Sequence, residues 1–173
     1  MHVSVDEFLQ AMARVPGPVT VVTTLDRQGR AWGFTASSFS SLSLRPPLVL
    51  VCLDKTASTH AAFVAASHFL VSVLAEGQAD VALRFAKSGS DRFAAGDTLP
   101  CELGLPGVPY ACARLACSLY QVIDVGDHSI LVGQVHSVHT GGDVALAYCD
   151  HSFARVVHTQ FELAGRPHDD DRR

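Results

Sequence analysis

The sequence predicts a mainly β protein, an antiparallel barrel with short helices at its rim. Three observations predict this class. Six or seven segments are rich in β-branched and apolar residues, tight turns join most of them, and helical patterns are few and short. Strands joined by tight turns pair as antiparallel neighbours, whereas a parallel sheet needs a long crossover between its strands.

The chain begins with a predicted helix and a predicted hairpin. Ser4 and Glu7 have the spacing of a capping box, and the helix they start should stop before the Pro-Gly-Pro at 16–18. A β-branched run at 19–24 and a run at 31–39 flank a short turn, which indicates a hairpin.

The middle of the chain predicts alternating strands and helices. Residues 48–53 are apolar on both faces and indicate a strand deep in the sheet. Helices are expected at 60–66 and 78–86, with a strand at 69–74 between them. Residues 87–109 hold seven glycines and prolines and predict a long loop, of the length that is usually functional or mobile.

The last third predicts a meander. Runs at 113–125, 129–139 and 145–148 have strand character, and turn residues separate them at 126–128 and 140–143. The 173 residues fit one domain, which we place at 1–163. Residues 164–173 are polar and are expected to form a disordered tail.

Composition limits the partners. Charged residues make up 17% of the chain, below the roughly 25% usual for soluble domains, which predicts that a second copy or a ligand covers apolar surface. The net charge of −4 and the lack of a Lys/Arg cluster argue against nucleic acid. The longest apolar run, at 46–53, is too short to span a membrane.

Cysteine usage and missing motifs limit the compartment and the chemistry. Five cysteines with no CxxC pair, behind an N-terminus unlike a signal peptide, predict a cytoplasmic protein with free thiols. The signatures of Rossmann, P-loop, α/β-hydrolase and zincin proteins are absent from the sequence. His136 and His139 should point to opposite faces of a strand, so no metal site is expected.

Two segments have the character of a ligand site. Residues 33–43 crowd small hydroxyl residues and alanine at a strand end, where a flat polar ligand can reach the backbone, or where a serine-rich loop simply lies. In residues 54–59, hydroxyl residues and Lys55 precede a helix, which suits either a phosphate or ordinary N-capping by Ser58 or Thr59. Together they could hold a ring and a phosphate, the shape of a flavin mononucleotide.

These segments also carry a family resemblance. The runs GFTASSFSSLSLRPPLVLVCLDKTAST, FLVSVLAEGQADVALRFA, GDHSILVGQV and LAYCDHSFARV resemble, in order and over about residues 12–157, the flavin reductase components of two-component flavin-dependent monooxygenases. The narrower resemblance is to members that accompany oxygenases in actinomycete natural-product pathways.

The resemblance implies a fold and an activity. The fold would be a homodimeric split β-barrel of Greek-key-like antiparallel strands with short flanking helices. The activity would be reduction of FAD or FMN by NADH or NADPH through hydride transfer to flavin N5. The reduced flavin would then pass to a partner monooxygenase. NADH is favoured because no pair of arginines stands out for a 2′-phosphate.

The resemblance also implies residue roles on the ring side of the flavin. The isoalloxazine would be contacted by four consecutive residues, Thr35, Ala36, Ser37 and Ser38. Of these, Ser38 would hydrogen-bond near N5 as a catalytic residue. The ribityl chain would lie along three further residues, mainly on their backbone groups: Cys52, Leu53 and Asp54.

On the phosphate side, the resemblance implies that Ser58 and Thr59 receive the phosphate, with Lys55 nearby. Arg84 and Phe85 would lie near the flavin phosphates. On the nicotinamide side, His128 would orient the dinucleotide as a second catalytic residue. The segment 147–149 departs from the pattern, because relatives often carry another aromatic residue or an arginine there.

Two other functions fit the same residues. One is a flavoprotein like pyridoxamine-phosphate oxidase, which has a related barrel and keeps FMN tightly bound. The other is a non-catalytic flavin- or haem-binding dimer. Consumption of NADH in the presence of free flavin distinguishes the reductase from both.

Overall fold

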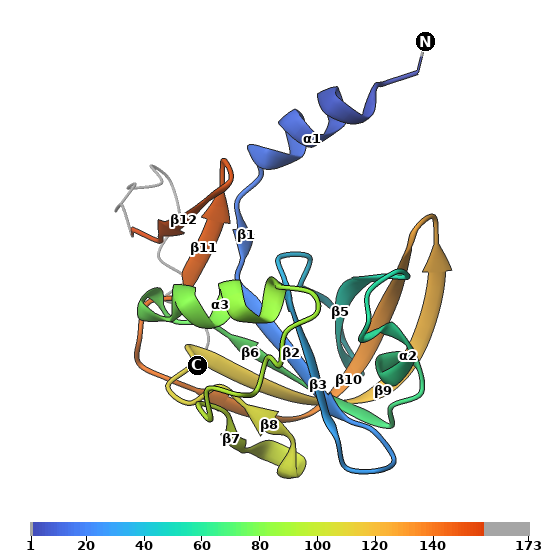
Figure 1. The fold of residues 1–173 in the computed structure, drawn as a ribbon, viewed down its shortest axis with the longest axis vertical. Coiled ribbons are helices and arrows are strands. Elements are labelled where there is room, and N and C mark those ends of the chain that lie inside the picture. The colour runs from blue at the N-terminus through green and yellow to red at the C-terminus, as the bar shows by residue number, and fades with distance from the viewer. Residues whose placement is uncertain (1, 158–173) are drawn as a thin grey trace, which may run out of the picture.

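A computed structural model describes residues 2–157 (Figure 1). The tail predicted at 164–173 lies outside the described residues, so that prediction stays open. The predicted mainly β class is confirmed: strands dominate, and the helices are short. No helix in the described part of the chain is long and apolar enough to cross a membrane.

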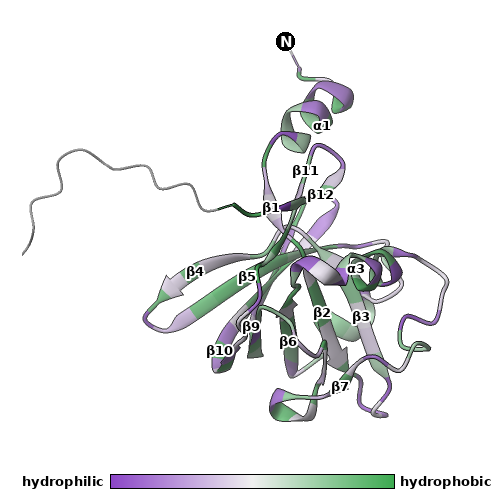
Figure 2. Cartoon of the chain, turned by 90° about the vertical axis from the view of Figure 1, so that its left-hand side faces the viewer, coloured by the Kyte–Doolittle hydropathy of each residue, from purple (hydrophilic) through white to green (hydrophobic). Residues whose placement is uncertain are grey.

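The N-terminal helix α1 (Val5–Ala13) begins where the sequence predicted. The Ser4 hydroxyl accepts a hydrogen bond from the Glu7 amide at 3.2 Å, and the Glu7 carboxylate accepts one from the Ser4 amide at 2.9 Å. The two bonds form a complete capping box. None of the residues of α1 is buried, and the helix projects away from the sheets in both views (Figures 1 and 2).

Seven of the strands form one antiparallel sheet, in the order β3-β2-β6-β9-β10-β5-β4. The predicted hairpin of β2 and β3 is present, and the first two strands of the predicted meander, β9 and β10, pair with each other. The third predicted strand of the meander forms but lies in a different sheet. The bounds of the strands, in chain order, are β2 (Thr20–Leu25), β3 (Ala31–Ala36), β4 (Ser40–Leu44), β5 (Pro47–Asp54), β6 (His68–Val73), β9 (Ala113–Val125) and β10 (His128–Thr140).

The expected closed barrel is not formed by hydrogen bonds. The seven-stranded sheet ends on β3 and β4, and these two strands are not paired with each other. The sequence also predicted that this strand extends to Phe39, whereas β3 ends at Ala36 and the chain reverses into β4. The reversal carries β4 to β5 at the opposite edge, which leaves an opening beside the ends of β3 and β5.

Short strands complete the fold. A three-stranded sheet consists of β1 (Gly17–Pro18), β11 (Leu146–Cys149) and β12 (Ser152–Arg155), of which β12 was not predicted. The predicted loop at 87–109 is not wholly irregular, because β7 (Leu99–Pro100) pairs with β8 (Pro106–Gly107) inside it. A 3₁₀ turn, η2 (Glu102–Gly104), joins these two strands.

Two helices cover the sheet next to the opening. Helix α2 (His60–Val64) ends two residues before the predicted boundary and buries Phe63. Helix α3 (Ala79–Ala86) follows a 3₁₀ turn, η1 (Glu76–Gln78), and buries Phe85. Phe63 packs edge-on against Phe34 of β3, with ring centroids 4.9 Å apart. The two helices therefore pack on the sheet through separate apolar clusters, Phe63 with residues of β2 and β3 and Phe85 with a residue of β2.

Candidate functional site

An open groove of about 440 Å³ occupies the opening beside β3 and β5. We call it the β3–β5 groove. Its walls come from the ends of both strands, the turn before α2, the end of α3 and the turn before β10. Ten of the site residues predicted from the sequence line it: Thr35, Ala36, Ser37, Ser38, Cys52, Leu53, Asp54, Thr59, Phe85 and His128.

The serine-rich wall of the groove is held by hydrogen bonds to its neighbours. The Ser38 hydroxyl accepts a bond from the Cys52 amide at 3.0 Å and so ties the end of β3 to β5. The Thr35 hydroxyl donates to the Ala82 carbonyl at 2.6 Å and ties β3 to α3. The Thr35 side chain is therefore used for structure, and what this wall presents to a ligand is mainly backbone and Ser37.

Phe85 reaches the groove because Gly33 leaves room for it. A Cβ added to Gly33 would lie 2.7 Å from the Phe85 ring, a separation that real Cβ atoms do not show. The glycine therefore lets α3 pack directly on β3. Phe85 is fully buried and forms the apolar wall next to the serine-rich segment.

The turn at 54–59 forms the other end of the groove. One carboxylate oxygen of Asp54 accepts hydrogen bonds from the Thr56 amide and hydroxyl, both at 2.7 Å. The bonds from Thr56 hold the pKa of the Asp54 carboxyl below its usual value. The Asp54 charge is thus satisfied inside the turn and is not left facing the groove without a partner.

Thr59 is the least satisfied group of the site. Its side chain is fully buried, and within residues 2–157 its hydroxyl is the only buried side-chain oxygen or nitrogen without a hydrogen-bond partner. Thr59 stands at the start of α2, yet its side chain does not cap the helix. A buried hydroxyl without a partner is costly, so this one is suited to a ligand atom that enters the groove.

Three predicted residues do not line the groove. The Lys55 ammonium donates to the Gly126 carbonyl at 2.9 Å. Ser58 faces a neighbouring cavity. Arg84 is bound to the 87–109 loop, since its Nη2 donates to Asp97 at 2.6 Å and its Nε to the Arg92 carbonyl at 3.0 Å. The structure therefore gives Lys55 and Arg84 protein partners, whereas the resemblance implied that both lie near a flavin phosphate.

His128 is the first residue of β10, where it pairs with Asp54 at the end of β5. Its Nδ1 lies 2.7 Å from a carboxylate oxygen of Asp127, and 43% of its side chain is exposed. The hydrogen bond to His128 holds the pKa of the Asp127 carboxyl below its usual value. The pairing fixes one ring nitrogen, and the other can face a ligand.

The sequence analysis missed Arg92, which also lines the groove. Arg92 belongs to the 87–109 loop, where its Nε donates to the Lys87 carbonyl at 3.2 Å. The length of that loop was the available signal for function, but loops carry no periodicity that would single out one residue. Phe34, Thr56, Ala57, Ala86 and Ser88 complete the lining.

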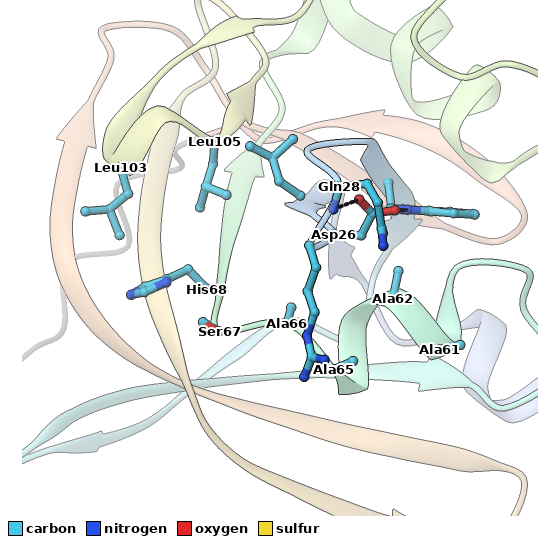
Figure 3. A pocket seen from close by; sticks show the side chains of 13 residues that line it. Asp26, Gln28, Ala61, Ala62, Ala65, Ala66, Ser67, His68, Leu103 and Leu105 are labelled. Carbon is cyan, nitrogen blue, oxygen red and sulfur yellow. Dashed lines mark hydrogen bonds between the residues drawn. The ribbon is translucent and has the colours of Figure 1, made fainter.

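A separate cavity of about 650 Å³ lies beyond the far end of α2 (Figure 3). Alanines of α2, His68 and the turn around Asp26 line it. The Asp26 carboxylate is already used, since it accepts from the amides of Gln28 and Arg30 and from the Trp32 indole. None of the predicted site residues lies there, and in the described part of the chain no three His, Cys, Asp or Glu side chains gather as metal ligands.

The fold and the groove together define a class: a mainly β protein with an open groove that is lined by a serine-rich strand end and by the turn before α2. Comparison with known families then identifies the family. Residues 12–156 match the flavin reductase like domain, and the chain belongs to that family.

Individual relatives agree with this assignment. Actinorhodin polyketide dimerase of Streptomyces coelicolor is 45% identical over 147 residues, which are 84% of this chain and 83% of that protein. The NADH:riboflavin 5′-phosphate oxidoreductase of Streptomyces pristinaespiralis is 46% identical over 135 residues, 78% of this chain and 77% of that protein. Further relatives are named as reductase components or subunits of flavin-dependent monooxygenases.

A solved structure shows the same fold. The NADH:FAD oxidoreductase SgcE6 of Streptomyces globisporus, in complex with NAD and FAD fragments, superposes with a TM-score of 0.82 at 33% identity. The match covers 91% of this chain and 97% of that chain.

Proposed function

We propose that this protein is an NADH-dependent flavin reductase that supplies reduced FAD or FMN to a partner monooxygenase. The observation that carries the proposal is the β3–β5 groove, with a serine-rich wall at one end and the unsatisfied Thr59 hydroxyl at the other. The family match and the relatives named as NADH-dependent flavin oxidoreductases support it.

The residues of the groove fit a flavin phosphate. The buried Thr59 hydroxyl can donate to a phosphate oxygen, and doing so removes the cost of leaving it without a partner. Within the described residues the amides of Ser58 and Thr59 form no hydrogen bonds, so they are free to donate as well. The phosphate would therefore be held mainly by neutral donors.

The serine-rich wall fits the ring. Ala36 and Ser37 lie at the end of β3, where hydrogen bonding to β2 stops and backbone groups can meet the polar edge of a flat ligand. The fully buried Phe85 supports this wall from behind by packing on Gly33, and Ser38 keeps Cys52 in place beneath the ribityl path. A bound flavin supplies the redox chemistry, accepting hydride at N5 from the nicotinamide of NADH.

His128 is suited to the nicotinamide side. It lines the groove beside Asp54, and its Nδ1 is paired with Asp127. The remaining ring nitrogen can orient the carboxamide or a phosphate of NADH. Its task would be to align the two rings, because the transfer itself needs no strong acid or base.

The small number of cationic side chains in the β3–β5 groove fits a flavin that dissociates after it is reduced. Lys55 and Arg84 are held by protein partners, so Arg92 is the one cationic side chain among the described residues that line the groove. A phosphate held by hydroxyls and amides is bound less strongly than one held by several cations. Release of the reduced product to an oxygenase would then be favoured.

A second copy of the chain would complete the split barrel. Helix α1 buries no residue, and Phe8 and Leu9 are 57% and 54% exposed. A cavity of about 800 Å³, mostly apolar, separates α1 from Cys52 and Ile130 on the outer face of β5 and β10. Exposed apolar area of this kind marks an association surface, so we place the dimer contact here. His128 lines both this cavity and the groove.

We propose a cytoplasmic location, which the five free cysteines support. The product would serve an oxygenase in the same cell, and the similarity to actinorhodin polyketide dimerase supports a role in natural-product biosynthesis.

One assay tests the proposal. The purified protein is mixed with NADH and free FAD, FMN or riboflavin, and the absorbance of the nicotinamide band is followed, with NADPH in parallel. We expect oxidation of NADH that depends on added flavin and saturates with its concentration. No oxidation with any flavin would overturn the reductase and favour a binding module. A yellow protein that keeps its flavin through dialysis would favour the alternative with a tightly bound cofactor.

A further inference from the structure

A second cavity of about 670 Å³ adjoins the β3–β5 groove and shares Arg92 with its lining. We call it the Trp32 cavity. Six of its lining residues carry the argument: Arg30, Trp32, Ser58, Asp91, Arg92 and Phe93. Arg92 lines both spaces, and Ser58 of the cavity is followed directly by Thr59 of the groove. The two spaces therefore meet where the flavin phosphate is proposed to lie.

The cavity contains a stack of two flat side chains, the Arg30 guanidinium and the Trp32 ring. The Arg30 guanidinium lies over the Trp32 ring, 4.4 Å from its centroid. The Trp32 indole donates to Asp26 at 2.9 Å, and Asp26 also accepts from the Arg30 amide at 2.9 Å. These bonds fix the stack in one orientation. Purine bases stack on aromatic rings and on guanidinium planes, so the stack suits an adenine.

The charges of the cavity are arranged for a phosphate beside a sugar. The Arg92 Nε donates a hydrogen bond to the Lys87 carbonyl. The two terminal nitrogens of Arg92 form no hydrogen bond within residues 2–157. They stand at the junction, where a second phosphate would follow the first. Asp91 is the acidic residue of the lining, and it accepts a hydrogen bond from the Phe93 amide at 3.0 Å. A carboxylate repels a phosphate and accepts from a hydroxyl, so it suits a ribose.

We propose that the Trp32 cavity receives the adenosine half of FAD, so that this chain selects FAD over FMN. The proposal rests on the flavin reductase function proposed above and adds the identity of the flavin. FMN would fill the β3–β5 groove alone and leave the Trp32 cavity unused. NADH carries the same adenosine group, and the experiment separates the two sources.

The test is a set of binding titrations. The dissociation constants of FAD, FMN and riboflavin are measured by flavin fluorescence and calorimetry, without NADH. We expect the wild-type protein to bind FAD at least about tenfold more tightly than FMN, since one added hydrogen bond to a charged group gives about that factor. Arg30→Ala and Arg92→Ala should each reduce the FAD-to-FMN affinity ratio by about tenfold.

Arg27→Ala is the matched control. Arg27 belongs to the same hairpin turn but lines the cavity of Figure 3 and not the Trp32 cavity, so its removal should leave the affinity ratio unchanged. Trp32→Phe keeps a flat ring and loses only the bond to Asp26. It should therefore retain more FAD selectivity than Arg30→Ala.

Two results would overturn the assignment to FAD. Equal affinities for FAD and FMN in the wild-type protein would do so directly. An unchanged FAD-to-FMN ratio in Arg30→Ala, together with a raised KM for NADH when FMN is the acceptor, would assign the cavity to NADH instead. Failure of the reductase function is distinguishable, because it removes NADH oxidation and leaves the flavin titrations measurable.

Discussion

Arg84 of α3 donates through Nη2 to the Asp97 carboxylate at 2.6 Å, across thirteen residues of sequence. Its Nε donates to the Arg92 carbonyl at 3.0 Å in the same loop. The side chains are 22% and 36% exposed, so the pair is partly shielded from water. Arg84 therefore fastens the loop that carries Arg92, and it acts on the groove through that loop.

Charge removal on either side of this ion pair tests that role. We expect Arg84→Gln and Asp97→Asn to weaken FAD binding to a similar extent, several-fold, because either change loosens the loop by about 1 kcal/mol after solvent screening. Fluorescence titration gives the affinities, and hydrogen exchange over residues 88–98 reports the loosening. If Arg84 bound the flavin phosphate itself, Asp97→Asn would free the guanidinium and FAD would bind more tightly.

The Thr59 hydroxyl gives a prediction in which stability and binding change in opposite directions. Thr59→Val keeps the shape and removes a buried hydroxyl that has no protein partner. We expect the flavin-free protein to gain about 1 kcal/mol in the free energy of unfolding, measured by urea denaturation, and to bind FMN at least about tenfold more weakly.

Thr24→Val is the control for Thr59→Val. The Thr24 hydroxyl is also buried, but it donates to the His68 carbonyl at 2.7 Å and lies away from the groove. Its removal should lower stability and leave FMN affinity unchanged. A Thr59→Val protein that lost stability and kept its FMN affinity would remove Thr59 from the phosphate site.

The elements that follow from local chemistry were predictable from sequence. The turn at 126–128 begins with Gly126, at φ +56°, and the strands on either side of it were placed to within one residue. The capping box of Ser4 and Glu7 likewise fixed the start of α1. Strand β4 was missed because its serines lack β-branching, and it forms only because β5 offers an edge to pair with.

The candidate site also contains residues that could be predicted from the sequence and residues that could not. Residues 35–38 and 52–54 come together because the ends of two strands meet at the opening, and motif resemblance could identify them. Lys55 and Arg84 were expected at a phosphate, but long side chains reach whichever acceptor the tertiary fold brings close. Their acceptors, the Gly126 carbonyl and Asp97, are set by loop positions that no local pattern encodes.

Acid should weaken the fold through the pair formed by Glu102 and Arg114. The side chains of Glu102 and Arg114 are 15% and 12% exposed and share two hydrogen bonds of 3.0 Å. The bonds from Arg114 hold the pKa of the Glu102 carboxyl below its usual value of 4.5. The unfolded chain therefore binds this proton first, so the contribution is complete above pH 4.5 and is lost as the pH falls below it.

Glu102→Gln removes that dependence. In the variant, the free energy of unfolding measured in urea should be lower at pH 7 and should fall less steeply between neutral and acid pH than in the wild type. Parallel curves for the two proteins would mean that Glu102 has the same pKa folded and unfolded, contrary to its pairing with Arg114.

His128 gives a prediction that separates the two substrates. His128 pairs with Asp54 in the register of β10 and β5, and its one side-chain hydrogen bond in the described part of the chain is to Asp127 and not to Thr59. We expect His128→Ala to raise the KM for NADH about tenfold, the equivalent of one lost hydrogen bond to a charged group, while the dissociation constant of FMN changes less than twofold.

Asp127→Asn keeps the imidazole of His128 and weakens only the hydrogen bond that supports its Nδ1. The KM of this variant for NADH should therefore lie between those of the wild type and His128→Ala. Steady-state kinetics with NADH as the varied substrate, combined with FMN titration, measure both quantities. A loss of FMN affinity at an unchanged KM for NADH would place His128 at the flavin and not at the nicotinamide.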